Sequence, residues 1–239
     1  MKTIKILLHI LLVIPLCLCI LVSSKKYQEK IIKFWCKQLL SIFEIKVKLE
    51  GMEVYLLNQK KYLIVANHIS WLDIIVIQSI KPSIFVAKSD VASWPLFGWV
   101  AHMTGTIFIK RDKVSDIKKA LKKMKRRLIK RCVCIFPEGT STNGRYVLPF
   151  KSNLFQSSID TQKAILPICL RYEEHNIYSD KVAFVDDMSL IDSIMQIKKE
   201  NNIEVIVDVL QLIRPRGNRK ELASYTHEII QKNLSQNLS

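Results

Sequence analysis

The stretch YLIVANHISWLD, at residues 62–73, combines a strand signal, a polar turn and the start of a helix. Residues 62–66 form a short apolar run with branched side chains, which predicts a buried strand. The pattern becomes polar at Asn67 and His68, and the apolar residues that follow predict a helix over 71–80. A strand that leads directly into a helix is the repeating unit of a parallel, helix-covered sheet.

The remainder of the chain repeats this alternation. Strands are predicted at 45–49, 62–66, 83–87, 106–109, 132–136, 164–171, 181–185 and 203–213, and helices at 71–80, 91–103, 114–131, 150–161, 190–199 and 218–234. Such alternation predicts an α/β fold with a mixed, mainly parallel sheet covered by helices. The 239 residues can bury one full-sized core, so we expect a single domain at 45–239 and an N-terminal helical segment at 1–44.

His68 and Asp73 lie five positions apart in the turn, and together they can remove a proton from a hydroxyl group. An imidazole accepts a proton near neutral pH, and a carboxylate bonded to its other nitrogen fixes the tautomer and stabilises the imidazolium. No serine or cysteine nucleophile motif accompanies them, so the activated hydroxyl can belong to a substrate. The pattern is short, and a histidine at the end of a strand is often structural. A metal site is not expected, because no third ligand with suitable spacing is visible.

Four blocks in order resemble the signature motifs of the glycerolipid acyltransferase family, which includes the 1-acylglycerol-3-phosphate acyltransferases. The blocks are NHISWLD at 67–73, GTIFIKR at 105–111, FPEGT at 136–140 and ILPI at 165–168. The resemblance implies a mixed sheet with the motifs in one cleft, so that 45–239 would be an acyltransferase catalytic domain. It also implies transfer of a fatty acyl group from a thioester, acyl-CoA or acyl carrier protein, to the free hydroxyl of a lysolipid, with no further cofactor.

The resemblance assigns roles to individual residues. His68 would be the general base and Asp73 its partner, while Gly139 would offer an exposed backbone N–H to the oxyanion because it lacks a Cβ. The residues expected to bind substrate are Lys88, Arg111, Glu138, Gly139 and Thr140. The guanidinium of Arg111 suits a phosphate, and Lys88 would add a second positive charge. Glu138 belongs to the acceptor-binding block, and an ion pair with a nearby base is the alternative.

The FPEGT block departs from the pattern of phosphatidic-acid-forming members at Ser141. Those members carry an arginine there for phosphate binding, and a hydroxyl cannot supply that charge. The runs GTSTNG at 139–144 and LPFKSNLF at 148–155 are similar to the lyso-ornithine-lipid acyltransferase branch. Two acceptors therefore stay open, 1-acylglycerol-3-phosphate, which gives phosphatidic acid, and a lyso-aminolipid. Arg145 and Lys151 could compensate for the missing charge.

The formal net charge of +16 favours an anionic partner. Nucleic acid is not expected, because no paired zinc ligands and no aromatic RNA-binding motif are present. Anionic membrane lipids are the expected partners, although the basic side chains of the predicted helix 114–131 could equally form an ordinary solvated face. An inert membrane lipid-binding protein that has kept the fold is the alternative from another class.

The N-terminus carries an apolar run at 6–22, interrupted by His9 and Pro15. A cleaved signal peptide, a spanning anchor and a half-inserted helix bent at Pro15 are three alternatives for this run. Residues 25–43 place aromatic and aliphatic side chains at helical spacing among lysines, which fits an interfacial helix or a helix that packs on the domain. The lysines that follow the apolar run predict an uncleaved anchor in the inner (plasma) membrane with the catalytic domain on the cytoplasmic face.

Overall fold

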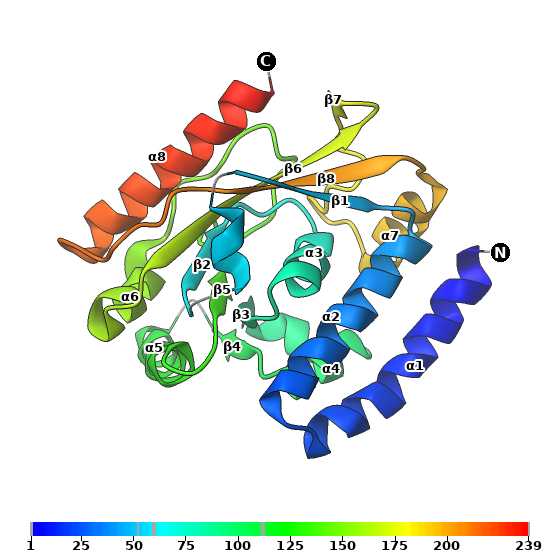
Figure 1. The fold of residues 1–239 in the computed structure, drawn as a ribbon, viewed down its shortest axis with the longest axis horizontal. Helices are drawn as coiled ribbons and strands as arrows, with labels where there is room; N and C mark the ends of the chain where they lie inside the picture. The colour runs from blue at the N-terminus through cyan, green and yellow to red at the C-terminus, as the bar shows by residue number, and fades with distance from the viewer. Residues whose placement is uncertain (1, 52, 59–60, 111–112, 239) are drawn as a thin grey trace.

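The computed structural model describes residues 2–51, 53–58, 61–110 and 113–238, and it contains one mixed sheet between layers of helices (Figure 1). The strands are β1 (Lys46–Glu50), β2 (Leu63–Ala66), β3 (Ile84–Lys88), β4 (Ile107–Ile109), β5 (Val133–Ile135), β6 (Ile165–Glu174), β7 (Ile177–Tyr178) and β8 (Ile203–Val209). The helices are α1 (Lys2–Val22), α2 (Lys25–Ile42), α3 (Leu72–Ile80), α4 (Phe97–Met103), α5 (Val114–Leu128), α6 (Gln156–Thr161), α7 (Leu190–Lys199) and α8 (Arg219–Asn237), with short 3-10 turns η1 (Val54–Asn58), η2 (Ser89–Ser93) and η3 (Ser152–Phe155). The predicted α/β class is confirmed.

The strand order in the sheet is β1-β8-β6-β2-β5-β3-β4, and β7 pairs with the outer end of β6. Strands β6, β2, β5, β3 and β4 run parallel, whereas β8 is antiparallel to β6 and β1 is parallel to β8. In the middle of the sheet, Val65 of β2 pairs with Ile135 of β5 on one side and with Pro167 of β6 on the other. Because the carboxyl ends of parallel strands meet at one edge, the segments that follow β2 and β5 are brought together there.

Alternating side chains of the central strands divide the core into two layers. Ile64 and Cys134 face the layer that contains α2 and α3, whereas Leu63 and Val133 face the layer that contains α5 and α8. All four side chains are fully buried. Burial on both faces explains why these strands are continuous apolar runs in the sequence.

Helix α1 packs along α2 on the outside of the sheet (Figure 1). The ring of His9 stacks on Trp35 with a centroid separation of 4.8 Å, and His9 Nε2 lies 3.1 Å from the carbonyl oxygen of Trp35. At the start of α1, Lys2 Nζ lies 3.0 Å from Glu44 Oε2 and donates to the carbonyl of Glu200 (3.2 Å). Among the described residues, α1 is the one helix long and apolar enough to cross a membrane, judged by length and composition. The division of the chain at residue 44 stays a prediction.

The strand predicted at 181–185 is wrong. This segment lies beside the turn that follows β2, and its backbone bonds are local or loop-directed, from Ala183 N to Asp180 O (2.8 Å) and from Phe184 N to Ile69 O (2.9 Å). Val182 is nevertheless fully buried. An apolar run with branched side chains indicates that a segment is buried. A strand also requires a neighbouring strand with free backbone groups.

Other elements differ from the prediction at their ends. The helix predicted at 91–103 is interrupted at Pro95, which disfavours a helical residue before it, so only η2 and α4 form. The helix predicted at 150–161 begins as η3 and becomes α-helical at Gln156. The strand predicted at 203–213 ends at Val209, since Leu210 N donates to the carbonyl of Pro167 (3.0 Å) but Pro167 has no N–H to complete the pair.

Asn67 extends the pairing of β2 and β6 beyond the end of β2. Its side-chain Nδ2 donates to the carbonyl of Leu170 (2.9 Å), and its Oδ1 accepts from Leu170 N (2.7 Å). The side-chain amide thus makes the two hydrogen bonds that the backbone of a further strand residue would make, and it is buried.

We expect Asn67→Ala to lower the free energy of unfolding by about 3 kcal/mol, because it leaves a buried N–H and a buried carbonyl of Leu170 without partners. Thermal unfolding in detergent micelles would measure the loss. Asn153→Ala is the control, since Asn153 is only half-buried in η3. Equal stability of the two variants would contradict a bridging role for Asn67.

Candidate active site

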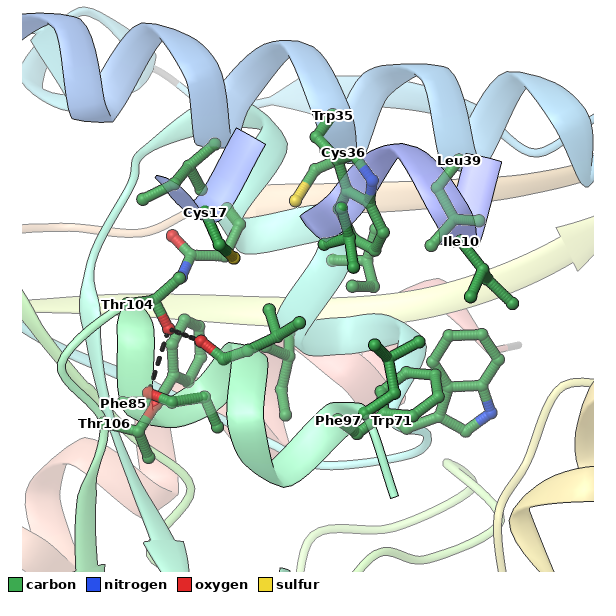
Figure 2. A pocket seen from close by; sticks show the side chains of 18 of the residues that line it. Ile10, Cys17, Trp35, Cys36, Leu39, Trp71, Phe85, Phe97, Thr104 and Thr106 are labelled. Atoms are coloured by element: carbon green, nitrogen blue, oxygen red, sulfur yellow. Dashed lines mark hydrogen bonds between the residues drawn. The ribbon is translucent and has the colours of Figure 1, made fainter. Parts of the chain in front are cut away.

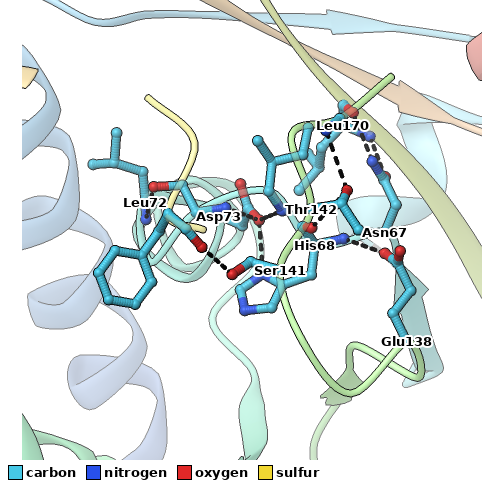
Figure 3. A network of polar contacts seen from close by, with 12 residues as sticks. Asn67, His68, Leu72, Asp73, Glu138, Ser141, Thr142 and Leu170 are labelled. Atoms are coloured by element: carbon cyan, nitrogen blue, oxygen red, sulfur yellow. Dashed lines mark hydrogen bonds and ion pairs between the residues drawn. The ribbon is translucent and has the colours of Figure 1, made fainter. Parts of the chain in front are cut away.

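The predicted site residues gather where the central parallel strands end. His68 follows β2 and Glu138 follows β5, and they are joined by Tyr172, which was not predicted and lies near the outer end of β6. Asp73 belongs to the first turn of α3, where the positive end of the helix dipole favours a carboxylate. Figure 3 shows the hydrogen bonds that link Asp73, His68 and Glu138.

The carboxylate of Asp73 is fully buried and accepts four hydrogen bonds. Its Oδ2 lies 2.8 Å from His68 Nδ1 and accepts from the backbone N–H groups of Ile69 (2.7 Å) and Ser70 (2.9 Å). Its Oδ1 accepts from the hydroxyl of Tyr172 (2.7 Å). An ionised carboxylate is only an acceptor, so Nδ1 of His68 carries the proton and Nε2 is left with a lone pair.

The imidazole of His68 is fixed on its face as well as at Nδ1. It stacks on the ring of Phe136, with centroids 4.1 Å apart and an angle of 12° between the planes. The side chain is 21% exposed, and no described residue hydrogen-bonds Nε2. The nitrogen that can take a proton is therefore accessible, while the rest of the ring is held in place.

Glu138 is held by backbone groups and forms no ion pair with a described residue. Its Oε1 accepts from His68 N (2.7 Å), and its Oε2 accepts from Leu148 N (2.8 Å). Both the ion-pair alternative, for which a base outside the described residues such as Arg111 stays open, and contact with an acceptor stay predictions. Burial raises the pKa of Glu138 to about 7, and the nearby charge of Asp73 acts in the same direction, although the two N–H groups oppose the shift.

The loop after Gly139 closes over the backbone of the β2 turn. Thr142 N donates to the carbonyl of His68 (2.9 Å), so both backbone polar groups of His68 are bonded to the FPEGT segment or the loop behind it. Gly144 has φ +85°, and a Cβ there would lie 2.8 Å from Cδ1 of Ile69. A residue without a side chain is therefore required where this loop meets the turn.

Gly139, at a predicted position of the FPEGT block, and Ser141, just after that block, form hydrogen bonds with residues other than His68 and Asp73. The N–H of Gly139 donates to the carbonyl of Phe136 (3.2 Å) and closes a turn, so an oxyanion would have to replace that bond. Thr140 is exposed. Ser141 donates its hydroxyl to the carbonyl of Phe184, which holds the side chain away from any further role as a donor (Figure 3).

Of the two predicted cations, Lys88 and Arg111, only Lys88 belongs to the described residues, and Lys110, for which no role was predicted, lies near it. Lys88 is the last residue of β3 and forms an exposed ion pair with Asp90. Lys110 follows β4 and is exposed. Arg111 lies outside the described residues. The register pairs Lys88 with Ile109 of β4, so the two strand ends that carry these cations are adjacent.

An apolar cavity of about 150 Å³ lies between α1, α2, α3 and α4. A column of rings connects it to the catalytic turn. Phe136 stacks on His68, and the centroid of its ring also lies 5.9 Å from that of Phe85. Phe85 in turn lines the cavity. Figure 2 shows Phe85, Phe97 and Trp71 around this space. The sequence does not reveal this space, because a helical stripe has the same pattern beside a cavity and beside packed side chains.

Tyr172 is the site residue that the sequence did not reveal. It lies between Arg171 and Glu173 near the end of β6, and no spacing in the sequence relates it to Asp73. Only the pairing of β6 with β2 and the packing of α3 bring its hydroxyl to Asp73.

We expect the stability of the folded protein to fall as pH rises from about 4.5 to about 7 because of Glu138. Its usual pKa of 4.5 is raised to about 7 in the folded state, so the unfolded chain loses this proton first and is favoured within that window. Below the window both states are protonated, and the contribution vanishes. Glu138→Gln should remove about 3 kcal/mol of this dependence.

Thermal unfolding in detergent between pH 4 and 8 would measure the slope. Glu228→Gln, at an exposed position of α8, is the matched control. If Glu138→Gln and Glu228→Gln had the same dependence on pH as the unchanged protein, the raised pKa would be contradicted.

Comparisons with known proteins agree with this geometry. Residues 46–171 match the protein-family model for Acyltransferase. The lyso-ornithine lipid O-acyltransferase of Pseudomonas aeruginosa is 28% identical over 205 residues, which cover 85% of this chain and 78% of that protein. The 1-acyl-sn-glycerol-3-phosphate acyltransferase of Neisseria gonorrhoeae is 39% identical over 120 residues, which cover 46% of this chain and 44% of that protein.

A solved structure has the same fold. The 1-acyl-sn-glycerophosphate (LPA) acyltransferase of Thermotoga maritima superimposes with a TM-score of 0.69 at 20% identity, over 99% of this chain and 97% of that one. Since the family match covers the strands and turns that hold His68, Asp73 and Glu138, the family expected from the sequence is confirmed. The chain belongs to the Acyltransferase family.

Proposed function

We propose that this acyltransferase transfers a fatty acyl group from an acyl thioester to the free hydroxyl of a lysolipid at a membrane surface. The observation that carries the proposal is the geometry of His68, whose Nδ1 faces a buried carboxylate while Nε2 is accessible. A histidine in this state is equipped to accept a proton from a hydroxyl.

The proposed reaction begins when the acceptor hydroxyl gives its proton to Nε2 of His68 as its oxygen attacks the thioester carbonyl carbon. The tetrahedral intermediate collapses with cleavage of the carbon–sulfur bond, and the imidazolium returns the proton to the departing sulfur. The products are an ester and a free thiol, so no other reactant is needed. Asp73 stabilises the imidazolium in between, and general base catalysis of this kind contributes about 10²–10⁴-fold to the rate.

The apolar cavity, of about 150 Å³, supports a substrate with a hydrocarbon chain, of which it would hold one segment. Its walls come almost entirely from aliphatic and aromatic side chains of α1, α2, α3 and α4. The rings of Phe85 and Phe136 lead from it to His68. An acyl chain in this cavity would keep its carboxyl end near the imidazole while the chain stays out of water.

For the acceptor we propose 1-acylglycerol-3-phosphate, which gives phosphatidic acid. The high positive charge and the exposed cations at the ends of β3 and β4, Lys88 and Lys110, favour an anionic headgroup. Acyl-CoA and acyl carrier protein are the proposed donors. A lyso-ornithine lipid is the second candidate, because Ser141 has no charge and its hydroxyl is already bonded to Phe184.

We expect the purified, detergent-solubilised protein to convert labelled long-chain acyl thioester and lysophosphatidate into phosphatidic acid. His68→Ala and Asp73→Asn should lower turnover by about 10²–10⁴-fold while the protein stays folded. Thin-layer separation of the labelled lipids would measure the product, with lyso-ornithine lipid tested in parallel. Product formed only from the lyso-ornithine lipid would show that this lipid, and not lysophosphatidate, is the acceptor. No His68-dependent product from either lipid would favour an inert lipid-binding protein.

The position of α1 supports a half-inserted helix over a spanning one. The start of α1 is tied by Lys2 to Glu44 and Glu200, and its end continues directly into α2. A helix held along the body in this way exposes one face. That face carries Ile4, Leu7, Leu8, Leu11, Leu12, Ile14, Leu18, Leu21 and Val22. We infer that this face enters one leaflet, and we propose the cytoplasmic leaflet of the inner membrane.

Helix α5 supports an additional attraction to anionic lipids. Lys118, Lys122, Lys123, Arg126 and Arg127 are exposed and form no ion pair with a described residue. The apolar stripe of the same helix is buried at Ala120, Met124 and Leu128. Arg131, just beyond α5, is close enough to Glu29 at the start of α2 for the two charges to interact, so the basic helix ends near the α1–α2 turn.

We expect the triple variant Lys118→Gln, Lys122→Gln and Arg126→Gln to bind vesicles with anionic lipid about 100-fold more weakly than the unchanged protein, since each basic side chain contributes about 1 kcal/mol at such a surface. Binding to neutral vesicles, which depends on α1, should not change. Flotation with vesicles of both compositions would measure this.

The control is a variant with Arg216, Lys220 and Lys232 changed to Gln, which removes the same charge from exposed positions on or next to α8. Figure 1 shows α8 on the opposite side of the molecule from α1. Equal losses in the two variants would indicate a general effect of net charge and contradict a specific role for α5.

A further inference from the structure

Tyr172 connects the sheet to the candidate catalytic pair. Its side chain is fully buried on β6, and its hydroxyl donates to Asp73 Oδ1 at 2.7 Å across 99 positions of sequence. We propose that Tyr172 is a positioning residue that holds Asp73 in its productive orientation and moderates the basicity of the carboxylate while His68 carries the transferred proton.

The other donors to Asp73 all come from the turn that also holds His68. They are the imidazole and the backbone N–H groups of Ile69 and Ser70, and each of them bonds Oδ2. Oδ1 is bonded by Tyr172. A carboxylate anchored through one oxygen can rotate about its own axis, whereas bonds to both oxygens fix its plane and therefore the direction in which it faces Nδ1.

The surroundings leave few other groups that could stabilise this carboxylate. Among the described residues, Cys134 on β5, Glu138 after β5 and Tyr172 on β6 interact electrostatically with Asp73, in addition to His68. An ionised Glu138 repels Asp73, and burial raises the pKa of Cys134 well above its usual value, so that thiol stays neutral. His68 is the partner that can become positive.

Burial and the neighbouring charge of Asp73 raise the pKa of Tyr172 well above its usual value, so its hydroxyl keeps its proton and stays a donor. This donor draws negative charge from the carboxylate. Without it, the carboxylate would bind a proton more tightly and would also hold the imidazolium more tightly. Both effects mean that, as the pH is lowered, activity is lost at a higher pH than in the unchanged protein.

The test is Tyr172→Phe, which removes one oxygen atom and keeps the packed ring. We expect kcat at pH 7 to fall about 10-fold, because one hydrogen bond to a charged group is lost from the pair, while KM for the acceptor stays within about twofold. The acid limb of the kcat profile should move to higher pH, and the deficit should shrink in alkaline buffer.

Tyr62→Phe is the matched control. Tyr62 is also buried, at 1% exposure, but it precedes β2 and lies at the end of that strand remote from His68. Its variant should keep the acid limb of the unchanged protein. A Tyr172→Phe profile that only falls in amplitude, with no shift along the pH axis, would overturn the inference and leave a purely structural role.

The inference rests on the proposed function, and a measurement without substrate separates the two. The imidazole resonances of His68 can be identified by their loss in His68→Ala and titrated by NMR in each protein. A higher titration midpoint in Tyr172→Phe than in Tyr62→Phe would support the positioning role, and equal midpoints would overturn it. If the unchanged protein acylated no lysolipid, the proposed function would fail while this result would still stand.

Discussion

The central constraint in this molecule is the burial of the Asp73 carboxylate. A buried charge is costly unless donors surround it, and here two backbone N–H groups, an imidazole and a phenol do so. The backbone donors require the tight turn between β2 and α3. The phenol requires β6 to lie next to β2. The hydrogen bonds that stabilise this one carboxylate therefore depend on both the order of strands in the sheet and the conformation of the turn.

Around this group, the turn that carries His68 is held by backbone bonds from distant segments. Glu138 accepts from His68 N, and Thr142 donates to its carbonyl. These contacts join positions about 70 residues apart. Because they involve the backbone of His68 and leave Nε2 accessible, the imidazole can be rigidly placed and still reach a substrate. The stacked ring of Phe136 links the same turn to the apolar cavity.

The sequence predicted most of the sheet and much of the site, but it could not distinguish burial from pairing. The runs at 62–66 and 132–136 became strands because each has a neighbour on both sides. The run at 181–185 is also apolar after Lys181, yet it packs as a loop against the β2 turn. Glu138 lies next to His68, as the order of the motifs predicted, but its bonds to two N–H groups depend on where the chain returns after 140.

The sequence by itself determined the family, the α/β class and the pairing of His68 with Asp73, because these depend on local patterns: the period of apolar residues, a short turn and a spacing of five positions. The tertiary structure decided that Tyr172 bonds Asp73, that Ser141 bonds Phe184, and that α1 lies along the body and lines the cavity. These contacts join residues from 43 to 99 positions apart, or whole helices. No local pattern encodes them, since they follow from the order of strands in the sheet and from which helix faces meet.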